Sequence, residues 1–267
     1  ALEYCGEVLQ KHPFVIVEEK LEGEEFSLQC LTDGKTVVAM PPVQDHKRAF
    51  VDDKGPNTGG MGSYSCEDHL LPFLKKRDVE EGVKITKKVA DAINKETNDF
   101  YKGVMYAGFI VTKSGIRLLE YNARLGDPEA MNVLPIMETD FVDVCNAVVN
   151  RQLHKIKIKF QNKATVCKYI VPEGYPDKPV KNQKIEIKKM PQNAKLYFAS
   201  VEQRGDGLYT MASRAIACLG IEDDLEKAER ISEKAAKSIK GNIFHRSDIG
   251  TEKLIEKRIK HMKEIMS

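Results

Sequence analysis

Leu118-Leu-Glu-Tyr-Asn-Ala-Arg-Leu-Gly-Asp127 decides how the rest of this sequence is interpreted, because an apolar, strand-like run there ends in charged and amide side chains. Alternate residues of a strand point to the same side, so Glu120, Asn122 and Arg124 are expected on one face. A carboxylate and an amide oxygen suit hard cations, and a guanidinium suits phosphate oxygens. The stretch therefore predicts a site for a nucleotide and its metal ion at the end of a strand.

The composition is that of a soluble globular protein. The chain has 267 residues, enough for one large or two smaller domains, and 42% of them are hydrophobic. Its net charge of +2 gives no electrostatic reason to expect nucleic acid or a membrane as partner. Six scattered cysteines without a CxxC or Cys/His cluster favour free thiols over a zinc site and indicate a reducing cytoplasm.

The first residues indicate that part of a longer protein precedes them. Ala1 opens directly into an amphipathic helix pattern over residues 2–9, without an initiator Met or a capping residue. We therefore expect an upstream part, which was either removed or is encoded as a separate chain.

The first 160 residues have alternating strand and helix patterns. Residues 44–65 are an exception, because they are polar and rich in glycine, without helical or strand period, which is typical of a functional loop. A hairpin turn is expected at Asp33-Gly34. The periodicity predicts strands over Phe14–Glu18, Glu25–Leu31, Thr36–Met40, Val104–Val111 and Ile116–Tyr121, and helices over Val79–Thr97 and Phe141–Val149, the latter with Phe141, Val144, Cys145 and Val148 on one face.

A boundary is expected near residues 153–163, where a lysine-rich, leucine-poor stretch intervenes. This divides the chain into domains of residues 1–160 and 161–267. The second domain is expected to be a small α+β unit, with strands over Thr165–Val171, Lys184–Ile187, Lys195–Val201 and Gly207–Ala212, and helices over 224–240 and 251–265.

Glu120 and Asn122 are the candidate metal ligands. Mg²⁺ takes few protein oxygens when phosphates and water complete its shell, so two ligands on a strand end suffice beside a nucleotide. An exposed polar strand end would give the same two residues, but Arg124 and the turn that follows favour a site. The alternative for Arg124 is a surface ion pair with Asp127 or Glu129, which would contribute only ~0–1 kcal/mol.

Two further segments have side chains suited to ligands. The bend Glu18–Glu25 could present backbone groups to an adenine ring and Glu25 to ribose hydroxyls, although its composition alone favours a plain acidic loop. Gly55–Gly62 can place backbone N–H groups around an anion, and it does not match a P-loop. The preceding Asp45–Arg48 supplies both charge signs, and His46 within it is expected to be a hydrogen-bonding partner rather than a base.

Together these motifs closely resemble the phosphoribosylamine–glycine ligase (glycinamide ribonucleotide synthetase) family of the ATP-grasp superfamily. Their order matches the family over nearly the whole chain. The segments 44–48, 55–62 and 122–129 are specific, whereas 174–176 and 246–250 only support the resemblance. The segments that carry it are 18–25, 44–48, 55–62, 106–108, 120–129, 174–176 and 246–250.

The resemblance implies the C-terminal half of an ATP-grasp domain followed by a small α+β domain of barrel-like, rudimentary hybrid type. It implies that ATP phosphorylates glycine and that 5-phosphoribosylamine attacks the glycyl phosphate, giving glycinamide ribonucleotide, ADP and phosphate in de novo purine biosynthesis. The implied cofactors are ATP with Mg²⁺ or Mn²⁺, and the implied location is the cytoplasm. Phosphoryl transfer of this kind depends mainly on positioning and charge neutralisation.

The resemblance also implies roles for individual residues. Glu120 and Asn122 would hold the metal, and Asn122 would also contact ATP. The catalytic residues would be Arg124, Asp45 and Lys47, and the remaining ATP contacts would be Glu18, Glu19, Lys20, Leu21 and Glu25. The substrates glycine and 5-phosphoribosylamine would be bound by Asp45, His46, Lys47, Arg48, Asn57, Thr58, Gly59, Gly60, Met61, Gly62, Arg124, Asp127, Pro128 and Glu129, with both assignments of loop to substrate left open.

The sequence departs from the family pattern in two respects. ATP-grasp relatives carry another acidic metal ligand on the preceding strand, where this chain has Ala107-Gly108, so two protein ligands are expected. The family's upstream part, with its phosphate-binding Lys, glycine-rich lid and part of the phosphoribosylamine site, is the expected partner of this chain, which is predicted to be inactive alone.

Other interpretations are another purine-pathway ATP-grasp enzyme, such as a biotin-carboxylase-like carboxylase or a formyltransferase, or a nucleotide-binding or structural module without chemistry. The sequence does not fix the oligomeric state, although a monomer is favoured, and no nucleic acid or membrane partner is expected.

Overall fold

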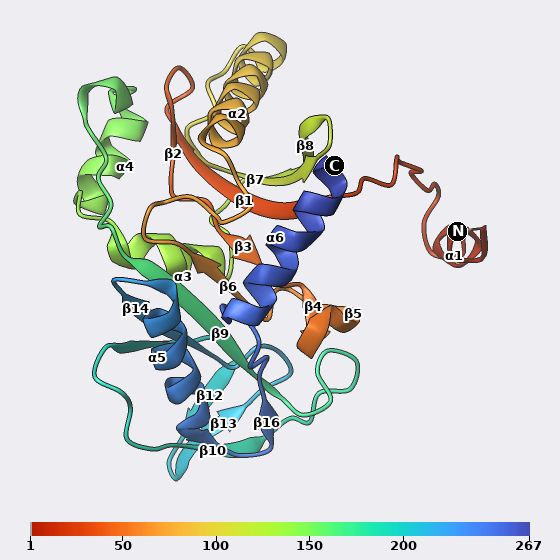
Figure 1. The fold of residues 1–267 in the computed structure, drawn as a ribbon, viewed down its shortest axis with the longest axis vertical. Coiled ribbons are helices and arrows are strands. Elements are labelled where there is room, and N and C mark those ends of the chain that lie inside the picture. The colour runs from red at the N-terminus through yellow and green to blue at the C-terminus, as the bar shows by residue number, and fades with distance from the viewer. Residues whose placement is uncertain (1) are drawn as a thin grey trace.

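The computed structural model describes residues 2–267 and begins with a segment that stands apart from the body. Helix α1 (Leu2–Leu9) buries none of its residues and projects to one side (Figure 1). Residues 10–23 form no helix or strand, so the strand predicted over Phe14–Glu18 is wrong. The side chain of Phe14 is 69% exposed. An extended segment needs a partner for its backbone, and none of the described strands pairs with this one.

The first sheet confirms four of the predicted strands. It has the order β2-β1-β7-β8, with antiparallel pairing throughout. Helix α2 (Lys76–Thr97) covers one face, where the hydroxyl of Tyr121 donates to Thr86 Oγ1 over 2.8 Å. The side chains of Glu120 and Asn122, the neighbours of Tyr121 on the strand, therefore point away from α2. The strands are β1 (Glu24–Thr32), β2 (Val37–Ala39), β7 (Gly103–Thr112) and β8 (Gly115–Asn122).

Strand β8 contains a bulge just before its polar end. Phe109 pairs with Leu118 but the adjacent Gly108 pairs with Glu120, so Leu119 is the extra residue. The side chain of Leu119 is 41% exposed, instead of lying on the covered face. The alternation that the sequence suggests therefore holds only from Glu120 onward.

The second sheet joins strands from both sides of the expected boundary. Its order is β11-β14-β9-β6-β3, with β16 also paired to β9. Two of its strands come from residues 44–65, where no regular structure was predicted, because Ser63 and Ser65 give β6 a polar pattern although both are buried. The strands are β3 (Gln44–Asp45), β6 (Gly62–Ser65), β9 (Ala164–Pro172), β11 (Ala194–Phe198), β14 (Ile216–Glu222) and β16 (Ile243–Phe244).

A third sheet and a short ribbon complete the strands. The sheet has the order β12-β13-β10-β15, and β4 (Arg48–Phe50) pairs with β5 (Lys54–Asn57) in the ribbon. The single strand predicted over Lys195–Val201 is instead two strands, because the chain turns after Phe198 and joins a different sheet. The strands of the third sheet are β10 (Gln183–Ile187), β12 (Val201–Arg204), β13 (Gly207–Thr210) and β15 (Ile239–Lys240).

The helices connect and cover these sheets. Helix α5 (Leu225–Lys237) packs on β14 and β9, and α6 (Glu252–Met266) runs up to β1 (Figure 1). The helix predicted over Phe141–Val149 is confirmed as α4 (Phe141–Val149), and of the four residues predicted on one face Val144 and Val148 are buried whereas Phe141 and Cys145 are exposed. The shorter helical elements are α3 (Glu129–Val133) and 3₁₀ turns at Val51–Asp53, Leu134–Ile136 and Leu153–Lys155.

The core follows this layering, with its largest apolar cluster reaching from α2 through both large sheets. The domain boundary at residue 160 stays a prediction, while β9 beyond it lies beside β6 in one sheet. Between residues 2 and 267 there is no helix whose length and apolar character would let it cross a membrane.

Candidate functional site

The end of β8 presents the two predicted metal ligands side by side. The amide nitrogen of Asn122 donates to Glu120 Oε1 over 3.3 Å, so both side chains lie on the face opposite α2. Their carboxylate and amide oxygens are hard donors of the kind that Mg²⁺ and Mn²⁺ prefer. Among residues 2–267 no cluster of three or more His, Cys, Asp or Glu side chains could hold a metal ion. The pair can thus supply two ligands of a shell that other molecules complete.

Arg124 lies two residues beyond β8 and is exposed. Its Nη1 donates to the carbonyl of Leu125 over 2.9 Å, and no carboxylate in the described part of the chain pairs with it. The alternative of an ion pair is wrong, because Asp127 pairs with Arg214 and Glu129 is buried among other partners. The guanidinium therefore keeps most of its donors free.

Lys47 lies among carboxylates near this end of the sheet. Its Nζ is 3.5 Å from Oε2 of Glu25, which lies on β1. Burial alone would lower the pKa of Lys47, but the charges of Glu25, Asp45 and Glu120 raise it. Carboxylates from three of the predicted segments thus raise the pKa of this ammonium group, which stays protonated.

Asp45 faces a second carboxylate. Burial and the charge of Glu129 raise the pKa of Asp45 well above its usual range, while the backbone N–H of His46 donates to its Oδ1 over 2.7 Å. Glu129 accepts hydrogen bonds from Tyr106 over 2.5 Å and from Ser27 over 3.0 Å. Burial and a nearby negative charge thus both favour the protonated form of Asp45.

His46 is buried, and neither of its ring nitrogens has a hydrogen-bond partner among residues 2–267. Its predicted role as a hydrogen-bonding partner stays a prediction. Burial lowers the pKa of His46 to about 3, and the charges of Arg246 and Arg258 act in the same direction. The imidazole is therefore neutral.

The glycine-rich segment folds back on the strand before it. The hydroxyl of Thr58 donates to the carbonyl of Lys47 over 2.8 Å, and the amide of Gly60 donates to Thr58 Oγ1 over 3.0 Å. At Gly60, φ is +110°, and a Cβ would lie 2.7 Å from both Asp45 Oδ1 and Pro128 Cδ. Only glycine fits there, because the loop passes directly between the other two predicted substrate segments.

The remaining predicted residues divide between exposed and buried positions. Met61 is buried in the core. A Cβ on Gly62 would lie 2.2 Å from the carbonyl of Cys167, so Gly62 allows the backbone of this segment to pass close to β9. Arg48 is exposed and donates to the carbonyl of Gly55 over 2.8 Å, and Asn57 is exposed beside it.

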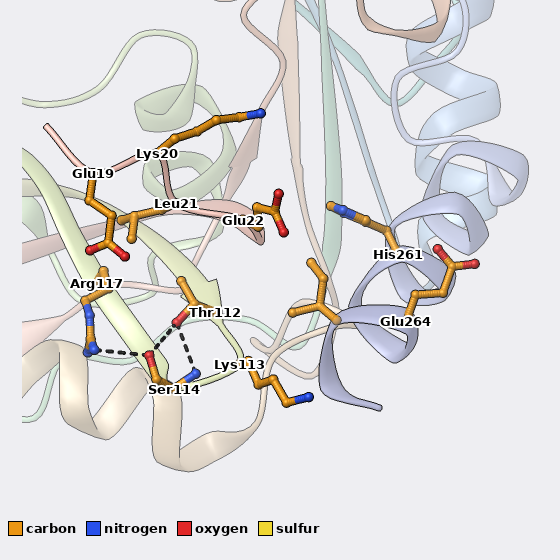
Figure 2. Close-up of a pocket in the computed structure, with 11 residues that line it drawn as sticks. Glu19, Lys20, Leu21, Glu22, Thr112, Lys113, Ser114, Arg117, His261 and Glu264 are labelled. Carbon is orange, nitrogen blue, oxygen red and sulfur yellow. Dashed lines mark hydrogen bonds between the residues drawn. The ribbon is translucent and has the colours of Figure 1, made fainter.

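Two neighbouring cavities adjoin these segments. One, of about 740 Å³, is lined by Glu25, Asp45, His46, Lys47, Arg48 and Asn57 together with residues of α6. The other, of about 820 Å³, lies between Glu19–Glu22, the β7–β8 turn and α6, as Figure 2 shows. His261 and Glu264 line both, so the cavities adjoin along α6. Of the predicted ATP contacts, Glu19, Lys20 and Leu21 line the second cavity and Glu18 lines neither.

A buried ionic network joins α6 to the turn Val51–Asp53, which lies between β4 and β5. Arg246 is fully buried and binds Asp248 through two nitrogens, at 2.9 and 2.7 Å, and Asp53 through a third contact at 2.9 Å. Arg258 of α6 binds the other oxygen of Asp53 over 2.5 Å. Burial opposes ionisation of Asp53, but the two guanidinium groups hold its pKa below the usual range.

The sequence prediction missed Arg214 and Tyr169, which contact two of the predicted substrate segments. Arg214 donates to the carbonyls of Gly59 and Gly60 and to Asp127, and Tyr169 donates to the other carboxylate oxygen of Asp127. Arg214 lies in a polar loop with no pattern around it, so local sequence offered no signal. The motif Arg246–Gly250, used only as support for the resemblance, supplies the ionic network.

The chain is similar to known proteins over nearly its whole length. The sequence profile described as "Phosphoribosylglycinamide synthetase, ATP-grasp (A) domain" matches residues 1–130, and that of the C domain of the same synthetase matches residues 165–252. The phosphoribosylamine–glycine ligase of Methanocella arvoryzae is 49% identical over 265 residues, which are 99% of this chain and 61% of that protein. The chain thus spans about 61% of the length of this relative.

Solved structures give the same picture. The crystal structure of phosphoribosylamine–glycine ligase from Thermotoga maritima matches with a TM-score of 0.75 and 29% identity, over 87% of this chain and 57% of that one. The biotin carboxylase domain of the Hydrogenobacter thermophilus 2-oxoglutarate carboxylase matches with a TM-score of 0.69 at 13% identity, over 98% of this chain and 58% of that one. The second match concerns the ATP-grasp type of fold alone.

Proposed function

This chain belongs to the phosphoribosylglycinamide synthetase family, and from this premise we propose that it carries part of the site that joins glycine to 5-phosphoribosylamine with ATP. The observation that carries the proposal is the position of Lys47, whose Nζ lies 3.5 Å from Glu25 Oε2 and whose pKa is raised by the charges of Glu25, Asp45 and Glu120. These residues come from three of the segments on which the family resemblance rests. The reaction would form glycinamide ribonucleotide, ADP and phosphate, as a step of de novo purine biosynthesis.

Glu120 and Asn122 fit a divalent cation, because their side-chain oxygens are hard donors at the end of one strand, where Glu120 is exposed and Asn122 partly exposed. Mg²⁺ or Mn²⁺ bound there would neutralise charge on the phosphates of ATP. Two protein ligands are few, which suits a cation that arrives with the nucleotide rather than one stored in the protein.

Arg124 and Lys47 would act on the phosphoryl group as fixed positive charges. Arg124 has free donors in the fork geometry that matches two phosphate oxygens, and it lies directly after the metal ligands. Lys47 stays charged because of the carboxylates around it. Charges already in place at a phosphoryl transfer site lower the barrier without further reorganisation.

Asp45 would bind the amine-bearing substrates in the cavity of about 740 Å³. Burial and the charge of Glu129 raise its pKa, which makes Asp45 a stronger proton acceptor than an ordinary carboxylate. An attacking amine must lose a proton as the C–N bond forms, and the Asp45–Glu129 pair lies where the glycine-rich loop and the strand end meet. Glycine and 5-phosphoribosylamine would both be bound around this pair.

The cavity of about 820 Å³ would take the nucleoside part of ATP. Glu19, Lys20 and Leu21 form its wall beside the β7–β8 turn (Figure 2). Backbone groups in such an irregular segment are available to the edge of an adenine ring.

All six cysteines of the chain carry free thiols, which supports the proposal of a reducing cytoplasm as the location.

Magnesium-dependent ATP binding tests the metal end of the site. Calorimetric titration of the chain with Mg-ATP should give an affinity that falls about a hundredfold in Glu120→Ala. The control is Glu80→Ala, which removes an exposed carboxylate from α2 on the opposite face of the sheet. Equal affinity in wild type and Glu120→Ala would contradict the assignment of the metal end.

Product formation tests the reaction itself. The chain combined with the part of a relative that it does not match should release ADP only when ATP, glycine and 5-phosphoribosylamine are all present. Nucleotide binding without any glycine-dependent release of ADP would favour a nucleotide-binding module over a ligase.

A further inference from the structure

Arg214 holds together two loops that are distant from it in the sequence. Its Nη1 lies 2.8 Å from the carbonyl oxygen of Gly59, 3.1 Å from that of Gly60 and 3.0 Å from that of Asp127. Its Nη2 donates to Asp127 Oδ2 over 2.9 Å. One side chain, from the loop between β13 and β14, thus binds the glycine-rich loop and the turn that follows β8.

Tyr169 completes the arrangement from β9. Its hydroxyl donates to Asp127 Oδ1 over 2.8 Å, so each carboxylate oxygen of Asp127 has one protein donor. The guanidinium of Arg214 stacks 4.5 Å above the Tyr169 ring, and the backbone N–H of Tyr169 donates to the carbonyl of Met61. Burial and the charge of Asp127 raise the pKa of Tyr169, which keeps the hydroxyl a donor.

The base of this arrangement is rigid. The carbonyl of Arg214 accepts from the amide of Ser200 over 2.9 Å, and the next amide, of Ala215, donates to the carbonyl of Ile170 over 2.8 Å. Ala215 and Ile170 are both buried. The loop that carries Arg214 is therefore fixed to the second sheet, while its guanidinium reaches the ligand-side loops.

The two loops that Arg214 joins also touch each other. A Cβ on Gly60 would lie 2.7 Å from Pro128 Cδ. Loss of the Arg214 hydrogen bonds would therefore free both loops at the place where Gly60 packs closely against Pro128. Both carboxylate oxygens of Asp127 and the carbonyls of Gly59 and Gly60 thus have partners in Arg214 or Tyr169.

We propose that Arg214 and Tyr169 are positioning residues: with Asp127 they form a clasp that fixes the glycine-rich loop against the turn after β8. The clasp needs arginine, because a planar fork can bind a carboxylate and carbonyls at once, whereas lysine offers one compact charge. In this arrangement the carboxylate of Asp127 and the carbonyls of Gly59 and Gly60 are parts of the clasp. The consequence for catalysis rests on the proposed function.

Hydrogen exchange of the unliganded chain tests the clasp without any assumption about the reaction. In Arg214→Lys and Tyr169→Phe, amides of residues 57–62 and 124–130 should exchange about tenfold faster, because the loops lose partners while the core is unchanged. The matched control is Arg204→Lys, since Arg204 also stacks on a tyrosine, Tyr209, and pairs with Glu202, but touches neither loop.

The outcomes are distinct. Faster exchange confined to these two segments, in both clasp variants and not in Arg204→Lys, supports the clasp. Unchanged exchange in the two segments would overturn it, and so would faster exchange spread evenly over the whole chain in both variants.

Kinetics then test what the clasp does. In a preparation that shows ligase turnover, Arg214→Lys should raise KM for a substrate held by the loops about tenfold and lower kcat less, whereas Arg204→Lys should change neither. Wild-type KM and kcat in Arg214→Lys would overturn the role in positioning. A lack of turnover in the wild type would count against the proposed function and leave the exchange result standing.

Discussion

Arg124 and Arg246 lie in two regions that differ in how an arginine is placed, exposed in one and buried in the other. Arg124 lies exposed after β8, and among residues 2–267 it donates only to the carbonyl of the next residue. Arg246 is fully buried and binds two carboxylates, with an additional contact to the carbonyl of Arg48. The difference teaches that paired, buried charges hold the loops of this site in place, while exposed charges without partners are the ones available to a ligand.

The largest expected effect is on the buried region. Arg246→Ala should lower the free energy of unfolding by about 3–5 kcal/mol, because it leaves Asp53 and Asp248 without their shared partner in a poorly solvated place. Urea unfolding monitored by circular dichroism measures this value. Arg124→Ala is the matched variant and should change the same free energy by less than about 0.5 kcal/mol. Similar losses in both variants would remove the distinction between the regions.

The second effect concerns pH. His46 has a folded-state pKa of about 3 and an ordinary value of 6.5, so the unfolded chain binds a proton first as the pH falls. Its contribution to stability is complete above about pH 6.5 and is lost as the pH falls toward 3, with a slope of up to about 1.4 kcal/mol per pH unit. Unfolding free energies between pH 7 and pH 5 should therefore fall less steeply in His46→Gln than in the wild type.

The exposed His12 provides the control for this measurement. His12→Gln should leave the slope as it is in the wild type. The same slope in His46→Gln and the wild type would mean that the imidazole is not held neutral between the arginines of the buried region.

The smallest effect is expected for an exposed ion pair of the site. Lys47→Met should change the unfolding free energy by less than about 1 kcal/mol, because Lys47 and Glu25 are both about half exposed. The buried Lys168, which binds Glu229 and Glu233, gives the contrast, and Lys168→Met should cost about 3 kcal/mol or more. Chemical unfolding of both variants at pH 7 decides the comparison, and a large loss in Lys47→Met would assign Lys47 to the fold rather than to a ligand.

Periodicity predicted the elements with clear apolar patterns. Strands β1, β7 and β8 and helices α2, α5 and α6 are close to their predicted positions, because each has one face that must be buried. The failures have physical causes. Phe14–Glu18 has the apolar character of a strand but no partner among residues 2–267, and β6 is a buried strand whose serines conceal it.

The sequence by itself determined the segments of the candidate site, since Glu120, Asn122 and the motifs at residues 44–48 and 55–62 are local patterns with a specific chemistry. Only the tertiary structure decided what surrounds them. Arg214 reaches Gly59 across 155 positions of the chain, and Arg246 reaches Asp53 across 193. Contacts between residues so far apart leave no local pattern, because they depend on how the two large sheets and α6 pack against each other.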